Sequence, residues 1–107
     1  MVSEDLKKSW KRTEAYLRDA RTHFSNAAEG TCSNEFHDFQ DYLDHNELGL
    51  ALKCLDDAFE RSGVEDLLVL ENMALAAASM GLQDRQRVYD ERLSLARGRT
   101  YETVLPS

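Results

Sequence analysis

The side chains of this chain that could do chemistry are mainly carboxylates, which are concentrated in its middle third. Glu35, Asp38, Asp41, Asp44 and Glu47 recur at every third position. Carboxylates serve acid–base or metal chemistry when several elements bring them together in a partly desolvated pocket. Here the spacing places them along one solvated helix, where only adjacent pairs come close. We therefore expect no catalytic residues and no enzyme activity.

Histidines and cysteines add no further chemistry to this pattern. His37 and Asp41 have the i, i+4 spacing of two metal ligands, but no second histidine pair supplies the others. Cys32 and Cys54 lack the CxxC spacing of zinc and redox sites, so we expect free thiols. No calcium loop, phosphate-binding glycine loop or nucleophile elbow is present. The sequence thus predicts no metal site and no cofactor.

Two amphipathic helices must position the carboxylates. Apolar residues recur at helical spacing on both sides of a short break, with charged residues between them. Leu50 and Cys54 project from the flank of the second stripe, which implies a covering third helix, the interpretation we favour, or an exposed apolar patch for a partner. The stripes are Phe36, Phe39, Tyr42 and Leu43 before the break, and Leu48, Ala51, Leu52, Leu55, Ala58 and Phe59 after it.

The break between these helices is predicted at His45. Asn46 is placed to cap the second helix through its side-chain oxygen, and Glu47 to sit in the first turn. His45 lies beside acidic residues, so it either fixes the corner by hydrogen bonds, which we favour, or titrates near neutral pH. We therefore assign Tyr42, His45, Asn46 and Glu47 to a structural corner.

The rest of the chain is also helical. A first helix capped by Ser3 has a heptad-like seam, which favours packing on a bundle over a coiled coil. Residues 28–33 read as a loop, with Ser33 or Asn34 capping the next helix. Glu65 and Asp66 open a helix running to about Met80, which is apolar on nearly every side and should be the most buried element. The seam of the first helix is Leu6, Trp10, Thr13, Leu17, Ala20, Phe24 and Ala27.

The last predicted helix is capped by Asp84 and ends at Arg97, with Tyr89, Leu93 and Ala96 on its inner stripe. A tail of residues 99–107 either docks through its apolar residues or remains loose. The chain of 107 residues has 42% hydrophobic residues and one proline, which argues for one folded domain. We predict an all-α fold, a single compact bundle of about five helices over residues 1–107.

The net charge of −7 is unevenly distributed. Residues 31–66 contain ten acidic and two basic side chains, whereas the first 30 residues contain five and six. Such a field repels nucleic acid and anionic membranes and favours a basic protein partner, unless the acidity only serves solubility. The basic first helix could contact phosphates, but internal pairing or a solvated face is more economical. No secretory signal or membrane span is evident, which places the chain in the cytoplasm.

The same central stretch resembles a known family. FHDFQDYLDHNELGLALKCLDDAF, and in particular Tyr42-Leu43-Asp44-His45-Asn46-Glu47-Leu48, is similar to the signature of the MafI-type immunity proteins. An alanine-rich helix ending in Met80-Gly81-Leu82 extends the resemblance, which covers residues 36–82. These small bacterial proteins are encoded beside polymorphic toxins and protect the producing cell by binding the toxin domain.

The resemblance implies a cognate toxin as the partner. Such toxin domains are often nucleases with basic grooves, which an acidic helix pair can occupy. The chain would act as a monomer or homodimer. A helical adaptor or regulatory subunit fits the composition as well, and a small enzyme would require a pocket joining His37 or His45 to several carboxylates. The predicted partner-binding residues are Asp38, Asp41, Asp44, Asp56, Asp57 and Glu60.

Overall fold

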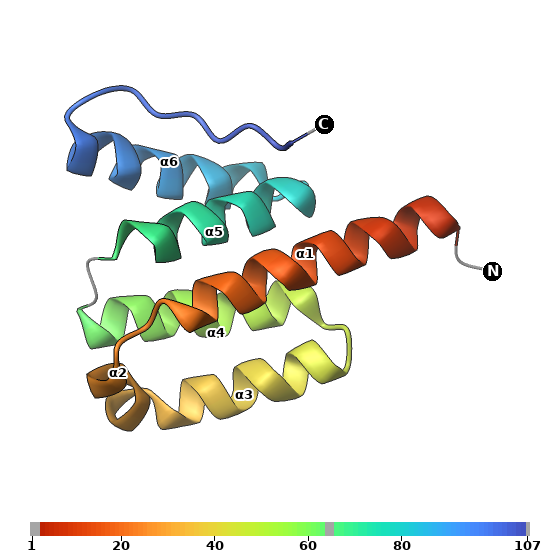
Figure 1. Cartoon of the computed structure of the whole chain (residues 1–107), viewed down its shortest axis with the longest axis horizontal. Helices are drawn as coiled ribbons and strands as arrows, with labels where there is room; N and C mark the ends of the chain where they lie inside the picture. The colour runs from red at the N-terminus through yellow and green to blue at the C-terminus, as the bar shows by residue number, and fades with distance from the viewer. Residues whose placement is uncertain (1–2, 64–65, 107) are drawn as a thin grey trace.

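The computed structural model describes residues 3–63 and 66–106, which form six α-helices and no strand (Figure 1). The fold is therefore all-α, as the sequence predicts. No helix in the described part of the chain is long and apolar enough to cross a membrane. The helices are α1 (Glu4–Thr22), α2 (Asn26–Thr31), α3 (Ser33–Asp44), α4 (Leu48–Ser62), α5 (Leu67–Ser79) and α6 (Gln83–Arg97).

The helix that the sequence did not predict is α2. Residues 28–33 were expected to form a loop, but Ser25 accepts a hydrogen bond from the Ala28 backbone N–H and caps a six-residue helix. Ala28 is buried in the core, and Arg21 of α1 pairs with Glu29 at 2.7 Å. These tertiary contacts hold a helix that is too short to be stable alone.

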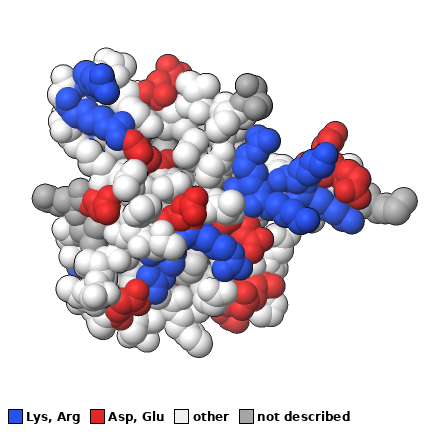
Figure 2. Space-filling model, viewed as in Figure 1, with Lys and Arg blue, Asp and Glu red and all other residues white. Residues whose placement is uncertain are grey.

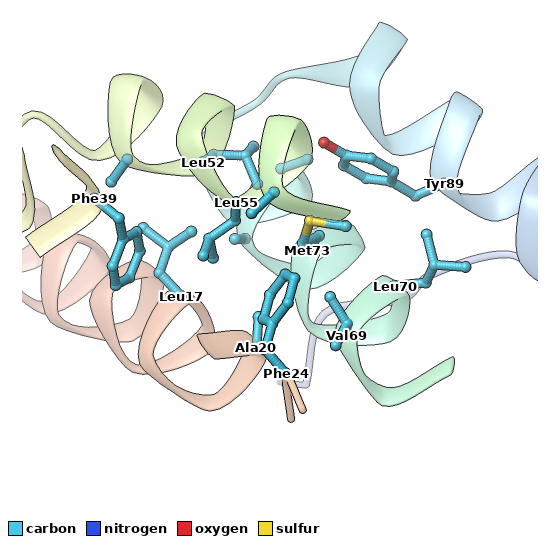
Figure 3. Packing of buried hydrophobic residues seen from close by; sticks show 14 of the residues in the cluster. Leu17, Ala20, Phe24, Phe39, Leu52, Leu55, Val69, Leu70, Met73 and Tyr89 are labelled. Carbon is cyan, nitrogen blue, oxygen red and sulfur yellow. The ribbon is translucent and has the colours of Figure 1, made fainter. Parts of the chain in front are cut away.

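Helix α5 lies at the centre of the fold. It packs against α1, α4 and α6, while α3 and α4 form an antiparallel pair on the opposite side of α1 from α6 (Figure 1). One hydrophobic core draws residues from all six helices, and Figure 3 shows its centre. The prediction that α5 is the most buried helix is confirmed, because Val69, Met73 and three of its alanines are buried. Of the residues predicted to open it, Asp66 is the N-cap, and Glu65 lies outside the described residues.

The seam of α1 packs within the chain rather than in a coiled coil. Leu17 and Ala20 are fully buried against α5 and α4. Thr13 is also buried, because its hydroxyl lies 2.6 Å from the Ser79 hydroxyl of α5 and bonds to the Ser9 carbonyl. The two ends of the predicted seam are exposed, unlike its centre. Leu6 is 44% exposed on a projecting part of α1, and Ala27 is exposed beside the buried Ala28.

Three predicted details of helix starts and faces are wrong. Helix α3 begins at Ser33 itself, so neither Ser33 nor Asn34 caps it, and Cys32 holds the N-cap position without a side-chain bond. Asp84 lies in the first turn of α6, after the N-cap Leu82, where its charge still favours the helix dipole. Ala96 is exposed, and Asp90 is buried on the inner stripe in its place.

Helix α6 offers a matched test of the core. Leu93 is fully buried, whereas Leu95 is 84% exposed on the same helix. We expect Leu93→Ala to lower the free energy of unfolding by about 2–5 kcal/mol, because it loses buried methyl groups and leaves a cavity. Leu95→Ala should change it by less than about 0.5 kcal/mol. Urea titrations followed by circular dichroism measure both, and equal losses would contradict this packing of α6.

Candidate protein-binding site

The corner between α3 and α4 is a Schellman turn. The Glu47 N–H donates to the Tyr42 carbonyl at 2.8 Å, and the Asn46 N–H donates to Leu43 at 3.1 Å. Asn46 has a φ of 56°, the left-handed conformation that this turn requires. The prediction that its side chain caps α4 is therefore wrong, since α4 has no side-chain cap and Glu47 occupies the N-cap position rather than the first turn. Asn46 serves the corner through its backbone, because asparagine tolerates this region better than most residues.

His45 closes α3 at this corner. Its Nδ1 lies 2.7 Å from the Asp41 carbonyl and 3.7 Å from the Asp41 carboxylate. The backbone hydrogen bond first, and then the charges of Asp41, Glu47 and Asp44, raise the pKa of His45 above its usual value. His45 thus makes a hydrogen bond at the corner, which is the role that we favour. Its raised pKa also fits the alternative, a group that titrates near neutral pH.

The structure divides the six predicted partner-binding residues into three groups. Asp38 of α3 and Asp57 of α4 are exposed, and both lie near the half-buried Cys54. Burial first, and then these two carboxylates, raise the pKa of the Cys54 thiol. Asp41 and Asp44 lie on the outer side of α3, where Asp44 accepts a hydrogen bond from Gln40 at 2.8 Å.

Asp56 and Glu60 belong to a different side of α4. Asp56 pairs with Arg85 of α6 at 2.6 Å, and Glu60 pairs with Arg92 of α6 at 2.5 Å. These ion pairs neutralise both carboxylates and tie α4 to α6. The six residues therefore do not form the single acidic face that the sequence suggested, because the register of α6 places its arginines opposite one flank of α4.

An apolar strip accompanies the unpaired carboxylates. Leu50, Cys54 and Asp57 recur at spacings of four and three, so they share one side of α4. On α3, Asp38 and the half-buried Tyr42 share a side in the same way. Leu50 is 45% exposed, so the covering third helix that we favoured is absent over it in the described part of the chain. We call Asp38, Tyr42, Leu50, Cys54 and Asp57 the hairpin face.

One group of basic side chains forms a second charged region of the surface, on α1. Figure 2 shows them along the projecting first half of α1, above the acidic end of the α3–α4 pair. Lys7, Lys8, Lys11 and Arg12 are exposed, and in residues 3–63 and 66–106 none of them forms an ion pair. The second half of α1 does pair internally, through its arginines to Glu14 and Glu29.

Comparison with known proteins leaves the site to be judged on its geometry. No model of a protein family matches the chain, and no curated protein or solved structure matches it either. Over the described ranges, no three His, Cys, Asp or Glu side chains are grouped closely enough to hold a metal ion.

One group of polar residues was missed by the sequence reasoning. Asp90 is buried on α6 and accepts two hydrogen bonds from Thr103, which is itself buried. The segment after α6 therefore docks, and it does so through Thr103 and Tyr101, whereas Val104 is 77% exposed. The available signal was an aspartate on the inner side of an amphipathic helix, because a buried carboxylate requires donors from another segment.

The left-handed conformation of Asn46 makes the corner sensitive to branching at this position. We expect Asn46→Val to lower the free energy of unfolding by about 1–3 kcal/mol, because a β-branched residue is strained at positive φ. Asn46→Gly should change it by less than about 1 kcal/mol, because glycine adopts this conformation freely. Thermal and urea unfolding of both variants measure the difference. If Asn46→Gly were as damaging as Asn46→Val, the side chain rather than the backbone would hold the corner.

The raised pKa of His45 predicts a pH-dependent contribution to stability. Because protonated His45 is favoured in the folded chain, its contribution is complete below its unfolded pKa near 6.5 and is lost as pH rises through the folded pKa. His45→Gln should therefore destabilise the chain more at about pH 5.5 than at about pH 8.5. His37→Gln, at an exposed position of α3, is the matched control. Unfolding curves at both pH values would contradict the assignment if the larger loss appeared at the higher pH.

Proposed function

We propose that this chain is a protein-binding module that neutralises a partner with a basic surface, as the MafI-type immunity proteins do with their toxins. The observation that carries the proposal is the hairpin face. It presents the exposed Leu50 and the half-buried Tyr42 on the same face as two carboxylates, Asp38 and Asp57. These carboxylates have no ion-pair partner among the described residues. The resemblance of residues 36–82, which includes the corner, supports the same conclusion.

The composition of the hairpin face suits a protein partner. Interfaces combine an apolar centre with a polar rim, and tyrosine is enriched among the residues that contribute most affinity. Tyr42 and Leu50 supply that centre, and Asp38 and Asp57 supply the rim. The helices beneath are held by the core, with Phe39, Leu52 and Leu55 buried behind the face. Little rearrangement is then needed on binding, which limits the entropic cost.

The mechanism we infer is occlusion guided by charge. The negative potential of the α3–α4 pair attracts lysine and arginine side chains and speeds encounter. Docking of Tyr42 and Leu50 then slows dissociation, because the buried apolar area must be exposed again for release. A toxin domain whose substrate groove is basic would be blocked, because the carboxylates of the hairpin face would occupy the groove in place of the substrate. The corner would orient the two helices without contacting the partner itself.

A helical adaptor is the second candidate, and the projecting end of α1 favours it. Leu6 is 44% exposed and Trp10 is only partly buried there, so the apolar seam continues beyond the core. Such an end can pair with another helix. Light scattering decides between a monomer and an assembly through α1, since Leu6→Glu would dissociate the assembly but leave a monomer unchanged.

Charge reversal on the hairpin face tests the proposal. The double variant Asp38→Lys, Asp57→Lys should lower the association rate with the toxin domain about tenfold or more at low salt, and by less at high salt. Its control is Asp19→Lys, Glu91→Lys, which makes the same charge change at exposed positions of α1 and α6. Surface plasmon resonance measures both rates with any toxin domain found to be encoded beside this gene, and circular dichroism verifies folding.

Protection of cells is the decisive readout. Co-expression of this chain with an adjacent toxin domain should restore growth, and the Asp38, Asp57 variant should protect less than its control. If the wild-type chain neither binds nor protects against that domain, the immunity function is wrong. If it protects while Leu50→Lys abolishes binding and charge reversal does not, the apolar centre rather than charge drives recognition.

A further inference from the structure

The segment that follows α6 is held on that helix by hydrogen bonds between side chains of α6 and the backbone of the segment. Gly98 ends α6 with a φ of 69°, and residues 99–106, here called the strap, turn back and run along α6 in the opposite direction (Figure 1). Most of the strap has no helical or strand structure of its own. Its position is therefore set by contacts with α6.

Three polar side chains of α6 make these contacts. Ser94 Oγ accepts from the Tyr101 N–H at 2.8 Å, and Asp90 Oδ2 accepts from the Thr103 N–H at 3.1 Å. Gln86 Nε2 donates to the Thr103 carbonyl at 3.2 Å. Gln86, Asp90 and Ser94 are four residues apart in turn and form one row along the helix, which we call the ladder.

The spacing of the ladder matches an extended peptide. Four helical residues advance by about 6 Å. Two residues of extended chain advance by about 6.5 Å, and their backbone groups point the same way. Successive ladder positions can therefore bind the backbone of every second residue, as they do at Tyr101 and Thr103. Because these contacts are to the backbone, the ladder accepts an extended chain with few demands on sequence.

Two side chains of the strap indicate which residues a bound peptide needs. The Thr103 hydroxyl donates to Asp90 Oδ1 at 2.5 Å, so the buried carboxylate selects a hydroxyl residue at this position. Two positions earlier, the Tyr101 ring lies 4.7 Å from the guanidinium carbon of Arg97, which also pairs with Glu71 of α5. The pattern that fits is therefore an aromatic residue, any residue, then threonine.

The strap leaves part of this region unfilled. An open cavity of about 810 Å³ lies between α6 and residues 100–102, and its lining includes the ladder together with Arg87, Glu91 and Leu95. Val104 of the strap is 77% exposed and Leu95 is 84% exposed, so neither fills it. A peptide with larger side chains could thus make contacts that the strap does not make.

We propose that the ladder is a docking site for an extended segment of a partner protein with the pattern aromatic, any residue, threonine, and that the strap occupies it as an intramolecular competitor. The contacts of the strap show which residues the ladder binds. A partner with larger side chains would also contact the unfilled cavity and would therefore bind more tightly than the strap. This surface is on α6 and is separate from the hairpin face, so the proposal stands independently of the proposed function.

Weakening the strap without touching the ladder tests this inference. Thr103→Val removes the hydroxyl donor and keeps the size of the side chain. Thr100→Val makes the same change at an exposed position whose hydroxyl, in the described part of the chain, forms no hydrogen bond with a ladder residue. The probe is a fluorescent peptide with the sequence of residues 98–106. Because a tethered competitor acts at about millimolar effective concentration, we expect the full chain with Thr103→Val to bind the probe about tenfold more tightly than the wild type or Thr100→Val.

The dependence on the ladder distinguishes docking from general stickiness. Adding Ser94→Ala or Asp90→Ala to the Thr103→Val chain should abolish the gain, and a probe with valine at the Thr103 position should bind weakly. Two variants are used so that the unfolding of α6 by one substitution, which circular dichroism reports, does not decide the test. Equal binding of the probe to folded Thr103→Val and wild-type chains overturns the proposal. So does a wild-type dimer that Asp90→Ala dissociates, because the occupant would then be the strap of a second copy.

Discussion

The burial of α5 on three sides is the constraint on which the other helices depend. A helix with almost no polar side is stable in water only when neighbours cover it, and its alanines let those neighbours approach closely. Helices α1, α4 and α6 take these positions, and α3 and α2 then complete the core from the far side of α4. Tyr89 of α6 is almost fully buried in this arrangement, and its burial raises the pKa of its hydroxyl to about 12.

The same arrangement determines which acidic residues remain available. Once α6 covers α5, its Arg85 and Arg92 face the flank of α4 that holds Asp56 and Glu60. The opposite flank, beside α3, has a single cross-helix ion pair, between Arg61 and Glu35, among the described residues. Excess negative charge therefore remains on one side of the molecule as a result of packing, although the sequence distributes it along both helices.

The amphipathic periodicity of the chain was sufficient to predict the helices and most of the core, since those features depend on residues close in sequence. Features that depend on tertiary contacts were missed or misassigned. Helix α2 forms because Ala28 is buried, and Asp90 is tolerated inside because Thr103 reaches it from another segment. For the candidate site, periodicity identified the exposed carboxylates, but only the register between α4 and α6 shows that Asp56 and Glu60 are already paired.

The packing of α1 on α5 also bears on the order in which the chain folds. Thr13 and Ser79 meet across 66 positions of sequence, so the buried side of α1 lacks its main partner until α5 has been synthesised. The α3–α4 pair is joined by a short turn and can form before α5 is synthesised, because contacts between residues close in sequence have a low loop-closure cost. On the ribosome, a nascent chain would therefore present the apolar side of α1 to chaperones while its α3–α4 pair is already assembled.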